Sequence, residues 1–309
     1  MKIKEFKTLS EQVAILKSKG LIINNDEWAK EVLLRENYLF LMGYRHLFLR
    51  SDVDRRYVDG VRFEEVYSLF LFDRDFRNII FKNLLIIENN LKSIFSYQLS
   101  KKYGYKEKDY LNPRNFTREP AKNRQVADLI SKMKRQIRVN SKQHRATLHY
   151  IDNYGYIPLW VLVKVLSFGI ISELYSILKQ EDQLSIAAYY DIDIENMISY
   201  LVILANYRNL CAHEDILYEH KTQRMINDNK YHLALNIPVM DNEYIYGKGD
   251  LFALILIMKA LLRKNEFSKM INEISMELYL LKANIRSIPF TKILDRMGFP
   301  ENWLDISKV

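Results

Sequence analysis

The chain has few of the residues that support disulfides, metal sites or glycine-rich loops. Its 309 residues include one cysteine, nine glycines and six prolines. The single Cys211 cannot form an internal disulfide, and no second cysteine offers the paired spacing of a thiolate zinc site. No Walker loop, dinucleotide-binding glycine pattern or serine hydrolase signature occurs. These absences exclude several enzyme classes and favour a reducing compartment, so we predict a cytoplasmic protein.

Long apolar runs and metal-ligand clusters are missing too. The N-terminal stretch MKIKEFKTLSEQVAILKSKG interrupts its apolar positions with charges, and no segment reaches the roughly 18 apolar residues of a spanning helix. His144 and His149 are five residues apart without a nearby set of cysteine or carboxylate ligands, which is poor zinc spacing. We therefore expect neither a membrane partner nor a metal or other cofactor.

Helical periodicity dominates what is present. Apolar residues recur three and four positions apart in most long segments, which predicts an all-α fold. The stretch from Phe63 to Tyr103 contains no glycine or proline and predicts one long helix or two. A first helix is expected between a Thr8 or Ser10 cap and Gly20. Further helices are expected at about 26–44, 121–138, 159–179, 194–214, 250–263 and 266–284, and a short strand or extended arm from 230.

Positive charge is concentrated in one segment. Lys101 to Arg145 holds 14 lysines and arginines against four acidic residues, whereas the rest of the chain has 32 basic and 34 acidic residues. We interpret residues of about 105–150 as a basic helical insertion in a core of 63–229, with an N-terminal helical region at 1–62 and a mostly helical C-terminal extension at 230–309. Such a surface can bind RNA phosphates without choosing a sequence, or simply keep the protein soluble. The candidate RNA-binding residues are Arg124, Lys132, Lys134, Arg135, Arg138, Lys142 and Arg145, and the aromatic residues that could stack on unpaired bases are Tyr103, Tyr105, Tyr110 and Phe116.

The stretch YRNLCAHEDILY at 207–218 places polar residues at the end of an apolar helix. Asn209 and His213 lie on one helical face, whereas Arg208 and His213 are five residues apart and diverge by about 140°. Two copies meeting across a symmetry axis would let arginine and histidine from both chains converge. A guanidinium that binds phosphate and an imidazole that exchanges protons near neutral pH can together break an RNA phosphodiester, with the ribose 2′-hydroxyl as nucleophile.

Each of these polar residues also has a purely structural interpretation. Arg208 can pair with a buried acid, and His213 can cap the helix end. Glu88 stands among apolar residues, where it could orient His213, neutralise Arg208, or pair with Lys92 four positions later. In FDRDFR at 72–77, the two arginines are secondary candidates for phosphate contact and otherwise form a solvated face paired with the neighbouring aspartates. An aromatic residue at 218 is expected to serve in packing.

Several segments together resemble a known family. They are SEQVAILKSKGLII at 10–23, ENYLFLMGY at 36–44, FDRDFRNIIFKNLLIIENNLKSIFSYQLS at 72–100, YLNPRNF at 110–116, PLWVLVKVLSFGIISELYSIL at 158–178, NYRNLCAH at 206–213 and MGFPENW at 297–303. In this order and at these distances they resemble the Abi-like abortive infection family of bacterial phage-defence proteins, of the AbiD and AbiF type. The core of that family is a HEPN domain with an Arg-x4-His ribonuclease motif.

The resemblance implies an all-α HEPN bundle that acts as a metal-independent endoribonuclease or as an RNA-binding effector. By this likeness Arg208 and His213 match the catalytic pair and Asn209 matches the polar residue after the arginine. Glu88 is the supporting candidate because of its position among apolar residues, and not because of the resemblance. The implied partners are single-stranded or small structured RNA and a second copy of the chain, joined through the motif face. The chain departs from the family after the histidine, where EDILYEH brings two acidic residues beside the expected site. A non-catalytic module that holds a small structured RNA is the alternative, and a purely protein-binding role is a weaker one.

Overall fold

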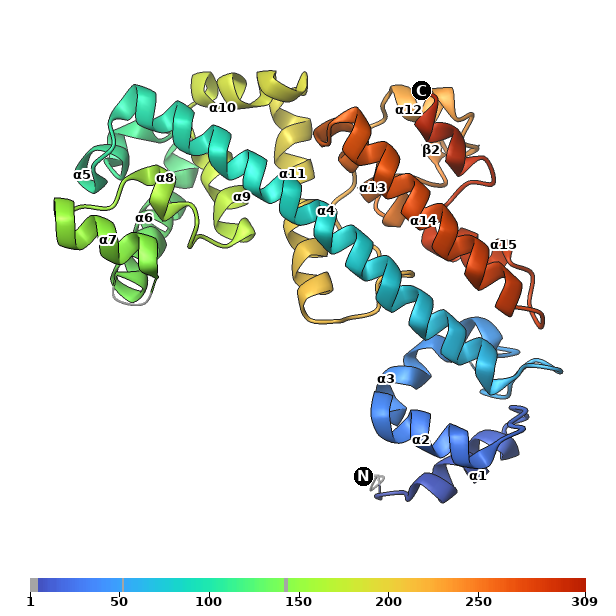
Figure 1. The fold of residues 1–309 in the computed structure, drawn as a ribbon. Helices are drawn as coiled ribbons and strands as arrows, with labels where there is room; N and C mark the ends of the chain where they lie inside the picture. The colour runs from blue at the N-terminus through green and yellow to red at the C-terminus, as the bar shows by residue number, and fades with distance from the viewer. Residues whose placement is uncertain (1–4, 52, 142–143) are drawn as a thin grey trace.

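The computed structural model describes residues 5–51, 53–141 and 144–309, and it has an all-α fold organised around one long helix (Figure 1). Helix α4 runs from Phe63 to Tyr103 without a break, which corresponds to about 60 Å at 1.5 Å per residue. It ends at Gly104, whose φ of 92° is a conformation that glycine adopts without strain. Of the two sequence-based alternatives for this segment, the single helix is therefore the one observed.

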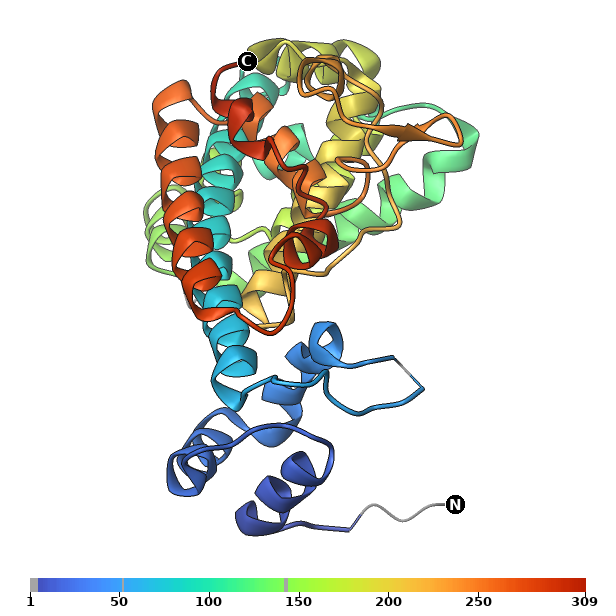
Figure 2. The same ribbon diagram turned by 90° about the vertical axis from the view of Figure 1, so that its right-hand side faces the viewer.

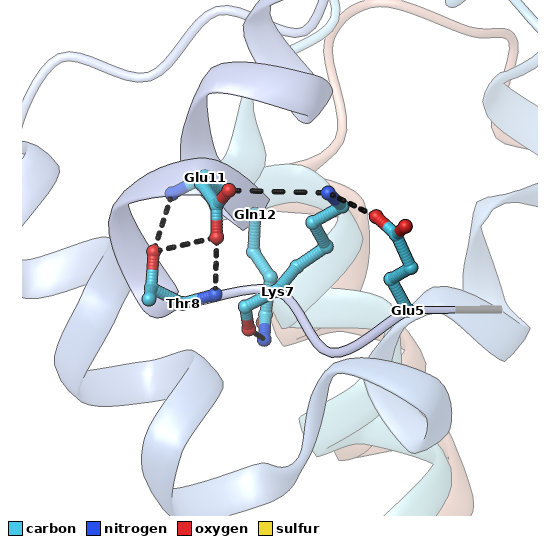
Figure 3. A network of polar contacts seen from close by, with 5 residues as sticks. All are labelled: Glu5, Lys7, Thr8, Glu11 and Gln12. Atoms are coloured by element: carbon cyan, nitrogen blue, oxygen red, sulfur yellow. Dashed lines mark hydrogen bonds and ion pairs between the residues drawn. The ribbon is translucent and has the colours of Figure 1, made fainter.

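Short helices cluster at the start of α4 (Figure 2). The first of them is capped by Thr8, whose hydroxyl accepts a hydrogen bond from the Glu11 N–H at 3.3 Å, while the Glu11 carboxylate accepts one from the Thr8 N–H at 2.7 Å (Figure 3). Of the two candidate caps, Thr8 is the one used. The helices of this region are α1 (Leu9–Ser18), α2 (Asp26–Glu36), α3 (Tyr38–Met42) and the 3₁₀ helix η1 (Gly43–Phe48).

The single helix predicted for 26–44 is wrong, because the chain breaks at Asn37. This residue has a φ of 65°, which is outside the helical region, and its side-chain oxygen accepts a hydrogen bond from the Leu39 N–H at 2.8 Å. An asparagine side chain can replace the backbone partner that a helix would have supplied, so it both ends α2 and begins α3.

The basic insertion forms the opposite end of the molecule from the N-terminal helices (Figure 1). Its main helix packs an apolar stripe of Val126, Leu129, Ile130 and Met133 into the core and leaves its basic residues outside. The insertion consists of α5 (Glu107–Tyr110), the 3₁₀ helices η2 (Pro113–Asn115) and η3 (Pro120–Lys122), α6 (Asn123–Asn140) and α7 (Arg145–Tyr154).

A second group of helices returns the chain to α4. The segment predicted as one helix at 159–179 is two, because Ser167 begins the second by accepting a hydrogen bond from the Ile170 N–H. The group comprises α8 (Leu159–Leu162), α9 (Phe168–Ile177), α10 (Gln180–Ala187), the 3₁₀ helix η4 (Ala188–Tyr190) and α11 (Ile194–Ala212). Helix α11 packs against both α9 and α4.

The C-terminal segment covers another side of α4, with α14 lying alongside it in both views (Figures 1 and 2). An ion pair of 2.6 Å between Lys82 of α4 and Glu273 joins the two helices. The strand or arm predicted from Lys230 is instead the start of a short helix, and pairing begins only at Val239. The elements are α12 (Lys230–Ala234), β1 (Val239–Met240), β2 (Glu243–Tyr244), α13 (Leu251–Leu261), α14 (Lys264–Asn284), α15 (Thr291–Met297) and the 3₁₀ helix η5 (Trp303–Ser307).

Helix α13 is the most deeply buried of these elements, with every residue from Leu251 to Met258 almost inaccessible to solvent. Its 11 residues are too few to cross a bilayer. Across the part of the chain that the structure describes, no helix has both the length and the apolar character that a membrane span requires.

Candidate functional site

Helix α11 carries the polar motif to its C-terminal end. The helix begins at the Asp193 cap and its last helical residue is Ala212. His213 is the C-cap residue, and its backbone N–H donates to the carbonyl of Asn209 at 3.1 Å. Burial raises the pKa of the Cys211 thiol to about 12, so this side chain belongs to the core and is a poor nucleophile.

Arg208 is anchored to α4 by a buried carboxylate. Its Nε lies 3.4 Å from Oε2 of Glu88, and Oε1 of the same carboxylate lies 2.6 Å from the ammonium of Lys92. The side chains of Glu88 and Lys92 are almost fully buried, whereas 30% of the Arg208 side chain is exposed. Two of the structural interpretations, an acid beside Arg208 and a Glu88–Lys92 pair, are thus both observed, and within the described residues Glu88 makes no contact with His213.

The anchored guanidinium keeps its outer nitrogens accessible. Only the Nε of Arg208 donates a hydrogen bond among the described residues, and the guanidinium carbon lies 5.8 Å from the centre of the Phe81 ring. Glu88 therefore orients the Arg208 side chain through its Nε and leaves both terminal guanidinium nitrogens of Arg208 available to a second anion.

His213 is exposed and lines a cleft of about 730 Å³. One wall of the cleft comes from α2 and α3, including Arg35 and Phe40. The opposite wall comes from α4, through Arg74 and Arg77, and from residues 212–216 at the end of α11. Arg208 is not among the lining residues. Within a single chain, His213 therefore lies in the cleft and Arg208 lies beside Glu88, so the two motif residues do not share one site. Asn209 is exposed on α11.

A buried aspartate of α4 holds the segment that follows His213. Asp73 is completely buried, and its carboxylate accepts hydrogen bonds from the backbone N–H groups of Leu217 at 3.0 Å and Tyr218 at 2.7 Å. Arg77 lies 2.7 Å from the same carboxylate and donates to the carbonyl of Asp215 at 3.0 Å. Burial raises the pKa of Asp73, while the two N–H groups and the guanidinium oppose that shift.

We call these contacts of Asp73 and Arg77 with the segment after His213 the clamp. It was only partly predictable from the sequence. Asp73 and Arg77 do pair with each other, as one interpretation of FDRDFR held, but they are buried and not solvated. Tyr218 is fully buried and stacks on Tyr44 at 5.8 Å, which confirms its role in packing. The signal for the clamp was an aspartate four residues before an arginine, since such a pair shares one helical face.

The rim of the cleft carries charges of both signs. Arg74 forms an ion pair with Glu36 of α2, and this hydrogen bond lowers the pKa of the Glu36 carboxyl. A third of the Arg74 side chain remains exposed. Glu214 and Asp215 are exposed directly after His213, as their position beside the motif predicted. The cleft is therefore mixed in charge.

The predicted RNA-binding residues lie on the outer surface of the insertion. Arg124 and Lys132 have carboxylate neighbours, Asp128 at 3.9 Å and Glu173 at 2.7 Å. Within residues 123–141 and 144–154, the other candidates form no ion pair with a described residue, and Lys142 lies outside the described residues. The candidates that are exposed are Arg124, Lys132, Lys134, Arg135, Arg138 and Arg145.

Two of the aromatic predictions are wrong. Tyr110 and Phe116 are buried at 4% and 2% exposure, and the Tyr110 hydroxyl donates to the carbonyl of Ile157 at 2.7 Å. Neither ring can reach a base. Tyr103 is partly buried and its hydroxyl donates to Asp182 at 2.6 Å, which leaves Tyr105 as the exposed member of the set.

Among the described residues, no group of three or more His, Cys, Asp or Glu side chains is close enough to hold a metal ion.

Comparison with known proteins gives one match. The family model described as Abi-like protein matches residues 31–219, which is more than half of the chain. The matched range runs from α2 to the segment held by Asp73 and so includes the cleft, the motif at the end of α11 and the insertion. No curated protein and no solved structure matches the chain.

Proposed function

The chain belongs to the Abi-like protein family, and we propose that it is a cytoplasmic phage-defence protein that cleaves RNA at the end of α11 without a metal ion. The observation that carries the proposal is the placement of His213. This exposed histidine lines a cleft at the end of a helix that packs against α4 and α9, and the segment after it is clamped by Asp73. A side chain on a clamped backbone is the arrangement that proton transfer requires, because the reacting atoms must be held within hydrogen-bond reach.

The chemistry needs only the motif residues and the RNA. His213 removes the proton from a ribose 2′-hydroxyl, and the resulting oxygen attacks the adjacent phosphorus. The bond from phosphorus to the 5′-oxygen breaks, and a proton is returned to that oxygen. Arg208 stabilises the phosphorane-like charge through its terminal nitrogens, and Asn209 positions the phosphate. The products are a 2′,3′-cyclic phosphate and a 5′-hydroxyl end, so the reaction consumes no water and no cofactor.

The complete site is composed of two copies of the chain. Within one chain, Arg208 points to Glu88 while His213 faces the cleft, as their angular divergence on the helix predicts. An exposed stripe of α11, with Val202, Asn206, Asn209 and His213, is available to meet the same stripe of a second copy. An isologous contact at this end of α11 places the motifs of the two copies side by side, so that Arg208 of one copy can meet His213 of the other. The basic residues of the insertion hold the RNA.

A second candidate function is a non-catalytic RNA-binding module. The exposed Glu214 and Asp215 favour it, because negative charge beside His213 repels a phosphate. In that case α11 is an interface, and the insertion holds a small structured RNA. Cleavage assays separate the two functions.

The test compares purified wild type, His213→Ala and a matched control, His46→Ala, which alters an exposed histidine that does not line the cleft. Each is incubated in EDTA with mixed-sequence single-stranded RNA and with total cell RNA, and product ends are analysed for cyclic phosphate. We expect cleavage by wild type and His46→Ala, and none by His213→Ala. RNA binding without cleavage by all three proteins would favour the second candidate.

The two-copy site has its own test. Arg208→Ala and His213→Ala are each expected to be inactive when assayed alone. When the two variants are mixed and their subunits exchange, a mixed dimer contains one complete site, in which the His213→Ala chain supplies Arg208 and the Arg208→Ala chain supplies His213. If the composite site is correct, the mixture recovers up to about a quarter of wild-type activity, because half of random dimers are mixed and each has one intact site of two. A mixture as inactive as its components would contradict the composite site.

A further inference from the structure

Five aromatic side chains gather on the surface of the insertion, in positions that neither the motif nor the basic helix explains. They come from four segments: the turn after α4, helix α7, the loop that follows it and helix α8. We call this cluster the aromatic patch, and its members are Tyr105, Tyr150, Tyr154, Tyr156 and Trp160.

The rings of the patch contact one another. Tyr156 lies between two neighbours, with ring centres 5.5 Å from Tyr105 and 6.3 Å from Tyr154. Tyr150 and Tyr154 are 5.3 Å apart on α7, and the Trp160 indole N–H donates to the Tyr150 hydroxyl at 3.4 Å. The patch is thus a continuous group of packed rings and not a set of scattered residues.

The patch is open to solvent in spite of this packing. Tyr105, Tyr154 and Trp160 keep 46%, 56% and 45% of their surface exposed. Packing within the patch therefore uses only part of each ring. Contiguous exposed aromatic surface of this kind is unusual on a protein without a partner and marks a binding site.

Cations lie at the patch and on the neighbouring helix, together with the acidic Glu107 and Asp152. The ammonium of Lys106 lies 5.4 Å from the ring centre of Tyr156 and 6.0 Å from that of Tyr105. Helix α7 begins at Arg145, and the chain enters it from α6, whose exposed basic residues include Arg135 and Arg138. A ligand of this surface must offer flat rings to the aromatic side chains and negative charge to the cations. Unpaired nucleic acid has both in every residue.

We propose that the aromatic patch stacks on unpaired bases of single-stranded RNA, whose phosphates are held by the basic residues of α6 and α7. The proposal deepens the proposed function, since it rests on RNA being the substrate and specifies an unpaired strand. Base stacking accepts any sequence, because every base has a π face. A duplex cannot use the patch, since its bases are already stacked and paired inside the helix. The patch therefore selects unpaired RNA over duplex RNA.

The experiment measures binding with cleavage switched off. All proteins carry His213→Ala, and the probes are a fluorescent oligouridylate of about 12 nucleotides and the duplex that it forms with oligoadenylate. The patch variants are Tyr154→Ala and Trp160→Ala. The matched control is Tyr279→Ala, which removes an even more exposed tyrosine from α14, away from the insertion. Tyr154→Phe keeps the ring and loses only the hydroxyl.

We expect each alanine variant of the patch to weaken oligouridylate binding by about tenfold, which is typical of one stacked base. Tyr154→Phe and Tyr279→Ala should bind as tightly as the parent, and duplex binding should be the same for all variants. The proposal is overturned if Tyr154→Ala and Tyr279→Ala bind the oligouridylate equally well. It is also overturned if Tyr154→Ala weakens duplex binding as much as single-strand binding, because that result indicates a change of fold or charge.

Failure of this inference and failure of the proposed function give different results. If wild type cleaves RNA but Tyr154→Ala binds the oligouridylate as tightly as its parent, the proposed nuclease function is supported and the aromatic patch does not bind bases. If binding depends on Tyr154 and no protein cleaves RNA, the patch stands as the base-binding surface of a non-catalytic module.

Discussion

Charge is treated in opposite ways along the body of α4 and beyond its last turn. Two carboxylates of α4 are buried with a cation beside each, Asp73 with Arg77 and Glu88 with Lys92. Around the insertion at its far end, cations such as Arg135 and Arg138 stand exposed on α6. The buried pairs of Asp73 and Glu88 are therefore distinct from the exposed positive charge of the insertion, which lies at the end of α4 opposite the N-terminal helices (Figure 1).

The comparison shows that buried and exposed charged residues have different roles in this protein. A buried pair has lost its water, so each partner depends on the other, and removing one leaves an uncompensated charge. Such pairs fix geometry, as Asp73 does for the segment after His213. Exposed cations keep their hydration and contribute little to folding, but they remain available to an anionic ligand. The first region should control stability and the second should control affinity for RNA.

The largest effect on folding is expected from Asp73→Ala. The change removes the acceptor for two backbone N–H groups and leaves Arg77 buried without an anion. We expect the free energy of unfolding to fall by about 3–5 kcal/mol, as for other broken buried pairs. Urea denaturation followed by circular dichroism measures this loss. The control is Asp59→Ala, since Asp59 pairs with Arg50 in solvent and should be dispensable. Equal effects of the two changes would contradict the distinction between buried and exposed charge.

A smaller effect is expected from Glu88→Gln. The amide keeps the shape of the side chain but cannot neutralise the buried ammonium of Lys92, so stability should fall by about 2 kcal/mol. Adding Lys92→Met removes the unpaired charge and should restore most of the loss. The same denaturation experiment measures both variants. If the double variant is no more stable than Glu88→Gln, then the loss arises from Arg208 and not from Lys92.

Local sequence patterns predicted much of this region. The absence of glycine and proline from residues 63–103 indicated α4, and the acid at 88 within an apolar stripe drew attention to Arg208 and Lys92 as partners. The Glu88–Lys92 pair follows from the 3.6-residue repeat, which relates residues on one helix, and the same periodicity predicted the all-α class. Membership in the Abi-like family followed from the order of segments along the chain.

Contacts between distant segments were not predictable in the same way. Asp73 meets backbone groups at 217 and 218, and backbone N–H groups carry no sequence signature. Tyr110 and Phe116 looked like surface aromatics because their segment is basic, yet the fold buries them. The aromatic patch was not predicted for a different reason. In HYIDNYGYIPLW at 149–160, Tyr150 and Tyr154 share a face of α7, but no helical period relates them to Tyr105, and only the turn between α7 and α8 brings Tyr156 beside Tyr105.

The smallest effect on folding is expected from replacing Lys134, Arg135 and Arg138 together by glutamine. None of the three side chains is buried, and they form no ion pair within the described residues, so the free energy of unfolding should not change measurably. Binding to an unpaired RNA should nevertheless weaken and become less sensitive to salt. Each phosphate contact on a single strand contributes about 0.7 to the slope of log affinity against log salt, so the slope should fall by about 2. Fluorescence anisotropy at several salt concentrations measures it. An unchanged slope would place the phosphate contacts elsewhere, and a loss of stability would show that the exposed cations also support the fold.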